Sequence, residues 1–194
     1  MIAGLILAAG ESSRMGVDKA LLTYRGRTFL ETILQNLREA GIDRVVVVLG
    51  HHAEEIKQAV NLHGAQVVVN QDYQQGQTSS LQAGLRALKD ADLEAVILCL
   101  VDYPAVSAEV VKRLLASFRK SGAPVIIPTC KNQRGHPVII GRALFQELLD
   151  LSPAEGANSL IRRYRDVTQY VEVGESGILL DVDDPETYHR LGET

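Results

Sequence analysis

The 194-residue chain has few cysteines, no apolar run long enough to cross a bilayer, and little net charge. Cys99 and Cys130 make no disulfide framework, and their spacing is not that of a zinc site. The apolar stretch near the N-terminus, residues 2–9, is too short for a signal-peptide core or a membrane span. A net charge of −4 argues against a surface that binds nucleic acid or polyanions in general. We therefore expect a cytoplasmic protein with no membrane or nucleic-acid partner.

Strand-like and helix-like segments alternate along the chain. Runs such as 44–49 and 95–101 are apolar at successive positions, which is typical of strands buried on both faces. Segments such as 29–40 repeat apolar residues at the spacing of one helical face. This alternation predicts a mainly parallel sheet with helices on both faces, a Rossmann-like α/β fold. The predicted strands are 2–8, 44–49, 66–69, 95–101, 125–128, 168–173 and 178–182, with a hairpin or irregular strand over 131–140, and the predicted helices are 29–40, 53–61, 78–88, 108–121, 142–151, 157–164 and 185–191.

The turn after the first predicted strand has the composition of a phosphate-binding loop. Its small residues are Ala8, Ala9, Gly10, Ser12 and Ser13. Small side chains let a ligand approach the backbone, and inward-pointing N–H groups of such a turn bind anions. Arg14 offers a planar fork for phosphate oxygens, and Lys19 offers a mobile point charge. The stretch therefore predicts a polyphosphate site at the carboxyl end of the first strand.

Two well-known phosphate-binding motifs do not fit this loop. The P-loop pattern needs a serine or threonine after its lysine, whereas Lys19 is followed by Ala20. The dinucleotide pattern GxGxxG fails because Ser12 stands where its second glycine is required. A nucleotide-dependent oxidoreductase on a doubly wound fold is therefore disfavoured.

Asp102 stands directly after the most apolar predicted strand, 95–101, and Pro104 then fixes a turn. Ligands of parallel sheets bind outside the carboxyl ends of the strands, which places Asp102 beside the first loop. Mg²⁺ is usually held by one or two carboxylates together with substrate phosphates. We therefore expect Asp102 to be a Mg²⁺ ligand rather than a residue that only caps a turn.

The first loop resembles the signature LAAGxSxRMGxxK of the molybdenum cofactor nucleotidyltransferase family, within the larger group of nucleotide-sugar-pyrophosphorylase-like enzymes. The matching residues are Leu7, Ala8, Ala9, Gly10, Ser12, Arg14, Met15, Gly16 and Lys19. The resemblance implies an enzyme that moves a nucleoside monophosphate from a nucleoside triphosphate to a phosphorylated acceptor, molybdopterin or molybdenum cofactor, and releases pyrophosphate. Arg14 would grip the β and γ phosphates, and Lys19 would sit at the α-phosphate and the incoming phosphate. Sugar-phosphate and methylerythritol-phosphate acceptors stay open, as does a catalytically silent nucleotide-binding regulatory module.

Three later segments also resemble elements of this family, in the same order along the chain. The segment 181–186 resembles D-x-D-T-P-E, which implies Asp183 as the second Mg²⁺ ligand, with Asp181 as the alternative. The segment 76–81 resembles an element that closes on the nucleobase. The turn Arg134-Gly135-His136-Pro137 resembles one that faces the acceptor. Each segment also has a plainer interpretation, as a solvated turn, a helix N-terminus or an exposed loop.

The candidate site residues form four groups. The catalytic candidates are Arg14, Lys19 and Asp102; the metal candidates are Asp102 and Asp183; the nucleotide-binding candidates are Leu7, Ala8, Ala9, Gly10, Ser12, Ser13, Arg14, Lys19, Asn70, Thr78, Ser79 and Ser80; and the acceptor-binding candidates are Arg134, Gly135 and His136. We expect one domain over residues 1–194, in which 1–129 binds the nucleotide and 130–194 supplies the acceptor side and the second metal ligand.

The pair Ala8-Ala9 bears on which nucleotide is used. The guanylyl branch of the family typically has Leu-Ala-Gly-Gly here, and the cytidylyl branch has Leu-Ala-Ala-Gly. The methyl group of Ala9 narrows the site, which affects a two-ring purine more than a one-ring pyrimidine. CTP is therefore the expected donor, with GTP as the alternative. A molybdoenzyme or a chaperone stays open as a protein partner.

Overall fold

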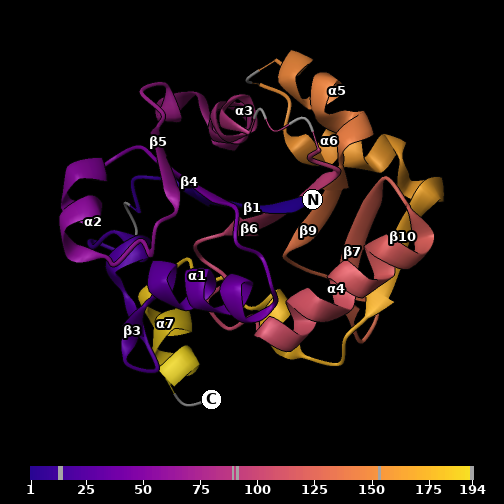
Figure 1. Cartoon of the computed structure of the whole chain (residues 1–194). Helices are drawn as coiled ribbons and strands as arrows, with labels where there is room; N and C mark the ends of the chain where they lie inside the picture. The colour runs from indigo at the N-terminus through magenta and orange to yellow at the C-terminus, as the bar shows by residue number, and fades with distance from the viewer. Residues whose placement is uncertain (13–14, 89, 91, 153, 193–194) are drawn as a thin grey trace.

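The computed structural model describes residues 1–12, 15–88, 90, 92–152 and 154–192 (Figure 1). Within these residues an eight-stranded sheet has the order β10-β7-β9-β6-β1-β4-β5, and β8 pairs with β7 outside this path. The strands are β1 (Ile2–Ala8), β4 (Val45–Leu49), β5 (Gln66–Val69), β6 (Ala95–Leu100), β7 (Val125–Cys130), β8 (Gln133–Arg134), β9 (Val138–Gly141) and β10 (Thr168–Glu172). Most pairs are parallel, whereas β9 runs antiparallel to both β6 and β7. The prediction of a mainly parallel sheet is confirmed.

Helices cover both faces of this sheet (Figure 1). The helices are α1 (Phe29–Glu39), α2 (Ala53–Ala59), α3 (Gln77–Ala87), α4 (Ala108–Ser121), α5 (Phe145–Asp150), α6 (Ala157–Arg163) and α7 (Pro185–Gly192). Because strand side chains alternate between faces, β1 sends Ile6 into one apolar cluster with α1, α2 and α4. Leu5 and Leu7 enter a second cluster with α3, α5 and α6. No helix in the described ranges is both long enough and apolar enough to cross a membrane.

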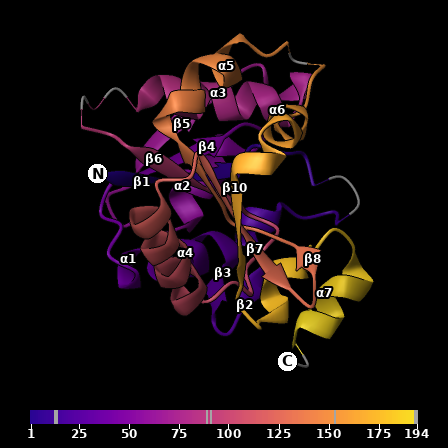
Figure 2. The ribbon, with the colours of Figure 1, turned by 90° about the vertical axis from the view of Figure 1, so that its right-hand side faces the viewer.

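The C-terminal part of the chain returns to the first half. The helix α7 lies beside a small two-stranded sheet, β2 (Thr23–Tyr24) and β3 (Arg27–Thr28), as Figures 1 and 2 show. Phe29, Val182 and Leu191 form a third buried cluster there. The rings of Tyr188 and Phe29 pack edge to face, with their centroids 5.8 Å apart. This contact holds the segment before α7 over the carboxyl end of the sheet.

The prediction of a strand over 178–182 is wrong. Residues Ser176–Leu179 form a 3-10 turn, and the chain then crosses the end of β6 without joining a ladder. At this crossing, Val182 N donates a hydrogen bond to the carbonyl of Asp102 at 2.9 Å. The apolar run at 178–180 is typical of a strand, but a strand also needs a free neighbour to pair with.

Gly84 lets α3 lie close to the sheet. A Cβ atom built on Gly84 would lie 2.3 Å from Leu5 Cδ1 and 2.9 Å from Val48 Cγ2. We expect Gly84→Val to lower the free energy of unfolding by about 2–3 kcal/mol, because extra methyl groups in a packed core force neighbours to move. Urea unfolding followed by circular dichroism measures this change. Gly192→Val is the control, because a Cβ on Gly192 meets nothing within 4 Å; equal losses in both variants would contradict the packing argument.

Candidate functional site

A pocket of about 290 Å³ opens at the carboxyl ends of β1 and β6. The first loop and the start of α3 line it, and carboxylates close one end. The lining residues are Leu7, Ala8, Ala9, Gly10, Ser12, Asp18, Lys19, Tyr73, Gly76, Gln77, Ser80, Leu100, Val101, Asp102 and Asp183. The structure thus brings together most of the predicted nucleotide-binding residues with Lys19 and both predicted metal ligands. Ser13 and Arg14 lie outside the described residues.

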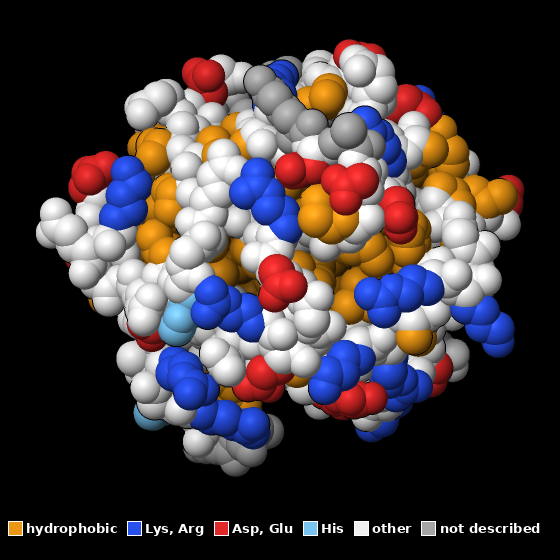
Figure 3. Space-filling view, in the orientation of Figure 1, with side chains coloured by type: hydrophobic (Ala, Val, Ile, Leu, Met, Phe, Trp, Pro, Cys, Tyr) orange, Lys and Arg blue, Asp and Glu red, His pale blue; other side chains and the backbone are white. Residues whose placement is uncertain are grey.

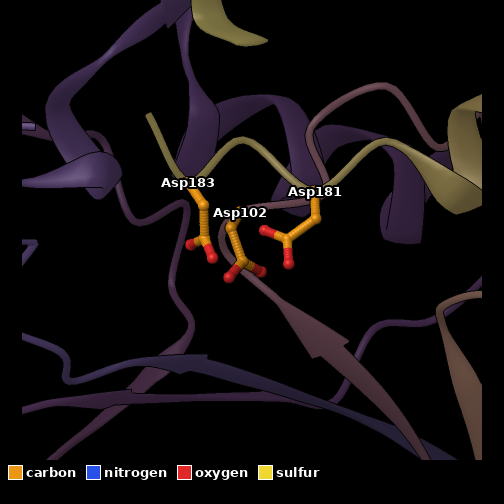
Figure 4. A group of neighbouring side chains, drawn as sticks. All are labelled: Asp102, Asp181 and Asp183. Atoms are coloured by element: carbon orange, nitrogen blue, oxygen red, sulfur yellow. The ribbon is translucent and has the colours of Figure 1, made fainter. Parts of the chain in front are cut away.

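Three carboxylates gather at the end of this pocket. Asp102 follows β6, whereas Asp181 and Asp183 lie on the segment that crosses it (Figure 4). One ligand oxygen from each residue lies within 4.8 Å of the other two. The two segments are held in place by the hydrogen bond from Val182 N to the Asp102 carbonyl. The crossing segment brings Asp181 and Asp183 to the same point, so both predicted alternatives for the second metal ligand lie beside Asp102.

The ammonium group of Lys19 lies among these carboxylates. Its Nζ forms an ion pair with Asp183 and lies 3.5 Å from Asp102 Oδ2. Burial raises the pKa of Asp102 above its ordinary value, although the Lys19 charge opposes this shift. Burial, together with the neighbouring Asp102 and Asp183, raises the pKa of Asp181 to about 6. The other oxygen of Asp102, Oδ1, is buried and has no hydrogen-bond partner.

This arrangement fits a divalent cation. One ammonium group balances only part of the charge of three neighbouring carboxylates; burial is the main cause of the raised pKa values of Asp102 and Asp181, and the neighbouring carboxylates add to it. Carboxylate oxygens are the ligands that Mg²⁺ and similar hard cations prefer. The unpartnered Asp102 Oδ1 is an available ligand atom. Asp102, Asp181 and Asp183 are therefore the residues that could hold such an ion.

The first loop places Lys19 through its own polar groups. Lys19 N donates to Ser12 Oγ at 3.0 Å, and Ala20 N donates to Asp18 Oδ1 at 2.9 Å. These two bonds cap the short 3-10 turn Lys19–Leu21 and leave the Lys19 side chain directed at the carboxylates. Ser12, predicted as a nucleotide-binding residue, thus also fixes the backbone of Lys19.

Asp18 is a pocket residue that the sequence analysis missed. Its side chain is 3% exposed, and its Oδ2 has no hydrogen-bond partner but lies 3.7 Å from His52 Nδ1. Burial raises its pKa. The His52 ring stacks against His51, which contacts the hydroxyl of Tyr73, another lining residue, through Nδ1 at 3.2 Å. An acid directly before Lys19 and two histidines after a buried strand were the available signals.

Several residues predicted to read the nucleobase lie behind the pocket wall. Asn70 Nδ2 donates to Ser79 Oγ at 2.9 Å and to Ser80 Oγ at 3.0 Å. Thr78 Oγ1 donates to the carbonyl of Glu155 at 2.6 Å. All four side chains are buried, and of these four only Ser80 lines the pocket. The network fixes the start of α3, which presents Gly76 and Gln77 to the ligand space.

A second cavity, of about 270 Å³, is lined by Tyr103, the residue that directly follows Asp102. The predicted acceptor residues Arg134, Gly135 and His136 line it together with Tyr103. A Cβ on Gly135 would lie 2.2 Å from the Ile178 carbonyl oxygen, so only glycine allows this turn to lie against the segment that leads to the carboxylates. The rings of Tyr103 and His136 lie 4.8 Å apart. Burial lowers the pKa of His136 to about 4, so its ring is neutral at pH 7.

Comparison with known proteins identifies the class to which the chain belongs. The chain shares its Rossmann-like fold with Rv0371c of Mycobacterium tuberculosis H37Rv, with 32% identity, a TM-score of 0.89, and coverage of 100% of this chain and 97% of that chain. A complex of Rv0371c with manganese superposes with a TM-score of 0.85 at 30% identity, covering 100% and 98% of the two chains. Residues 4–167 match the family described as "MobA-like NTP transferase domain", and the protein belongs to this family of nucleotidyltransferases.

Two curated relatives extend over nearly the whole chain. "Nicotine blue oxidoreductase" of Paenarthrobacter nicotinovorans is 33% identical and covers 98% of this chain and 96% of its own. "Molybdenum cofactor cytidylyltransferase" of Escherichia coli (strain K12) is 26% identical and covers 95% of this chain and 92% of its own. The resemblance read from the first loop is thereby confirmed at the level of the family.

The raised pKa of Asp181 makes the stability of the metal-free protein depend on pH. A carboxyl whose pKa is higher in the folded state stabilises the fold when protonated, and this contribution is lost as the pH rises through about 6. We therefore expect Asp181→Asn to raise the melting temperature at pH 7 in the presence of EDTA, and the gain to disappear near pH 4. Thermal unfolding at several pH values measures it.

The control variant for this experiment is Asp184→Asn. The backbone N–H of Thr187 donates to the Asp184 carboxylate and lowers its pKa, so this substitution is expected to destabilise the protein near neutral pH. If both variants changed the melting temperature in the same direction, the charge argument would be wrong.

Proposed function

We propose that this protein is a divalent-metal-dependent transferase that moves CMP from CTP to the phosphate of molybdopterin or molybdenum cofactor and releases pyrophosphate. The observation that supports it best is the cluster of Lys19 with three carboxylates, Asp102, Asp181 and Asp183, at the end of the first pocket, directly before Tyr103 of the second cavity in the chain. The nucleotide would occupy the pocket lined by Asp183 and residues of 1–129, and the acceptor would occupy the cavity beside Arg134 and His136. Both substrates would then meet at Asp102.

The transfer needs charge neutralisation and alignment more than acid–base chemistry. A phosphate oxygen of the acceptor forms a bond to the α-phosphorus, while the bond between that phosphorus and the bridging oxygen of pyrophosphate breaks. Both substrates carry negative charge, so the Lys19 ammonium would draw them together at the α-phosphate. Arg14 would hold the departing β and γ phosphates, since its planar fork suits a fixed anion.

The carboxylates Asp102 and Asp183, with Asp181 as the alternative to Asp183, would hold Mg²⁺ or a similar ion. Such an ion, when bound, supplies Lewis-acid stabilisation of the charge that develops on the phosphate oxygens. The buried Asp102 Oδ1 offers one ligand atom. In the absence of the ion, Lys19 partly balances these carboxylates, which keeps them close together before the metal arrives.

The composition of this site also argues against an oxidoreductase and against a catalytically silent module. One relative is named for an oxidoreductase activity, but the first loop lacks the GxGxxG pattern, and three clustered carboxylates suit metal-dependent phosphate chemistry better than hydride transfer. A silent nucleotide-binding module would not need these carboxylates. Sugar phosphate and methylerythritol phosphate are the alternative acceptors, and GTP is the alternative donor. The deciding assay follows pyrophosphate release from each triphosphate with Mg²⁺ and each acceptor.

Asp102→Asn tests the metal-binding role. We expect the turnover number to fall by about a thousandfold or more, because removing a metal carboxylate costs several kcal/mol of transition-state stabilisation. Mn²⁺ should also stabilise the variant less than the wild type in thermal unfolding. The control Asp166→Asn removes an exposed carboxylate that pairs only with Arg165 among the described residues. Near-normal Mg²⁺-dependent turnover by Asp102→Asn would remove Asp102 from the site.

The donor preference is tested by competition between CTP and GTP at equal concentration. Ala9 is 6% exposed and lines the nucleotide pocket, so its methyl group limits the space for a base. Steric exclusion by one methyl group is worth about 1–3 kcal/mol, so CTP should be preferred by about 10- to 100-fold in kcat/KM. Ala9→Gly should then raise kcat/KM for GTP and leave that for CTP nearly unchanged. A wild-type preference for GTP would refute the cytidylyl assignment.

A further inference from the structure

The helix α6 also lines the acceptor cavity, although no motif in the sequence indicated it. Asn158, Ile161 and Arg162 of this helix line the cavity. Residues 158 and 162 are one helical turn apart, so their side chains emerge on the same face of α6. The cavity therefore has a polar and cationic far wall in addition to the predicted acceptor residues.

Arg162 differs from its neighbours in its charge partners. Arg163 forms an ion pair with Glu147 at 3.6 Å, and Arg165 forms one with Asp166 at 3.4 Å. For Arg162, no carboxylate of the described residues lies within ion-pair distance. Arginine offers five N–H donors in a planar fork, which suits carboxylate, phosphate or carbonyl oxygens. Its position on the cavity wall makes a ligand the natural partner.

The rest of the cavity favours a flat, ring-shaped ligand. The Tyr103 and His136 rings form one side, and Ile127, Val138 and Ile161 add apolar surface. Tyr103 directly follows Asp102, so a ligand against this ring can reach the carboxylate cluster with its other end. A short polyol chain would leave the rings and the apolar side chains without contact.

We propose that Arg162 and Asn158 are a second anchoring point for the acceptor. They bind an anionic or carbonyl group at the end of a ring-containing acceptor that is remote from its reacting phosphate. This inference rests on the proposed function, because it requires the reacting phosphate to lie at Asp102. Arg162 and Asn158 then select acceptors by their far end, and a phosphorylated heterocycle is favoured over a sugar phosphate or a methylerythritol phosphate.

Steady-state kinetics with molybdopterin, CTP and Mg²⁺ test this role. Losing a hydrogen bond to a charged group weakens binding of the ligand, so we expect Arg162→Gln to raise the acceptor KM about tenfold or more. The turnover number and the KM for CTP should change less than about twofold, because Arg162 lies away from the nucleotide pocket. Arg162→Lys should recover part of the loss, since it keeps the charge but not the fork.

Arg163→Gln is the matched control, because Arg163 is the next residue of α6 and pairs with Glu147 instead of lining the cavity. An unchanged acceptor KM in Arg162→Gln, or an equal rise in both variants, would overturn the proposal. Asn158→Ala should raise the acceptor KM in the same direction by a smaller factor, since it removes a neutral hydrogen bond.

A binding measurement without turnover separates this inference from the proposed function. Pterin-6-carboxylate, a fluorescent planar heterocycle with one carboxylate, serves as the probe for wild type, Arg162→Gln and Arg163→Gln. We expect the dissociation constant to rise about tenfold in Arg162→Gln only. Equal binding by all three proteins, or no binding to the wild type, would overturn the anchoring role. A wild type that binds the probe but transfers CMP to no acceptor would instead refute the proposed function.

Discussion

The contact between the Lys19 ammonium and the carboxylates of Asp102 and Asp183 is the interaction on which the site depends. Asp102, Asp181 and Asp183 bring like charges within 4.8 Å of one another, which is unfavourable in a partly buried position. Lys19 offsets part of that repulsion, and the backbone bond from Val182 to Asp102 holds the two acidic segments together. The cluster is therefore assembled before a cation binds, at some cost in stability.

The position of Lys19 depends in turn on buried polar groups around the first loop. Ser12 and Asp18 accept backbone N–H groups at the turn that carries it. Asp18 is nearly inaccessible and faces His52, so the turn after β4 contributes a side chain to the support of the loop after β1. The residues that support Lys19 are spread over two βα loops, which is how parallel sheets commonly build ligand sites.

The antiparallel strand β9 divides the sheet into two parts. It separates β7 and β10 from the four-stranded parallel part that carries the nucleotide pocket. The turn before β9 brings His136 against Tyr103, the residue that directly follows Asp102. In the proposed reaction the two substrates would approach Asp102 from different cavities, and a displacement at phosphorus requires the entering and leaving groups to be aligned. On the face seen in Figure 3, basic and acidic side chains are interspersed. The three carboxylates gathered around Lys19 contrast with this even mixture of charges.

Local patterns in the sequence were enough for the framework. The apolar runs predicted β1, β4 and β6 because burial on both faces requires successive apolar side chains, and α1 begins where Thr28 and Glu31 form a capping box. The signature of the first loop indicated the family, and the end of β6 marked Asp102 as a ligand candidate, a role that stays a prediction.

Other features were decided only by the tertiary structure. The segment 178–182 is mostly apolar but pairs with no strand of the described residues, and it crosses the end of β6 and carries both Asp181 and Asp183. Asp18 was signalled only by its place before Lys19, and Arg162 was not signalled by any motif, since their burial or exposure to a cavity depends on segments distant in the chain. Periodicity is a property of neighbouring residues, so the sequence by itself determined the helices and most of the strands, and it marked the first loop as a candidate phosphate-binding loop. Which charges meet depends on how β6, α6 and the crossing segment pack, and only the folded chain decided that.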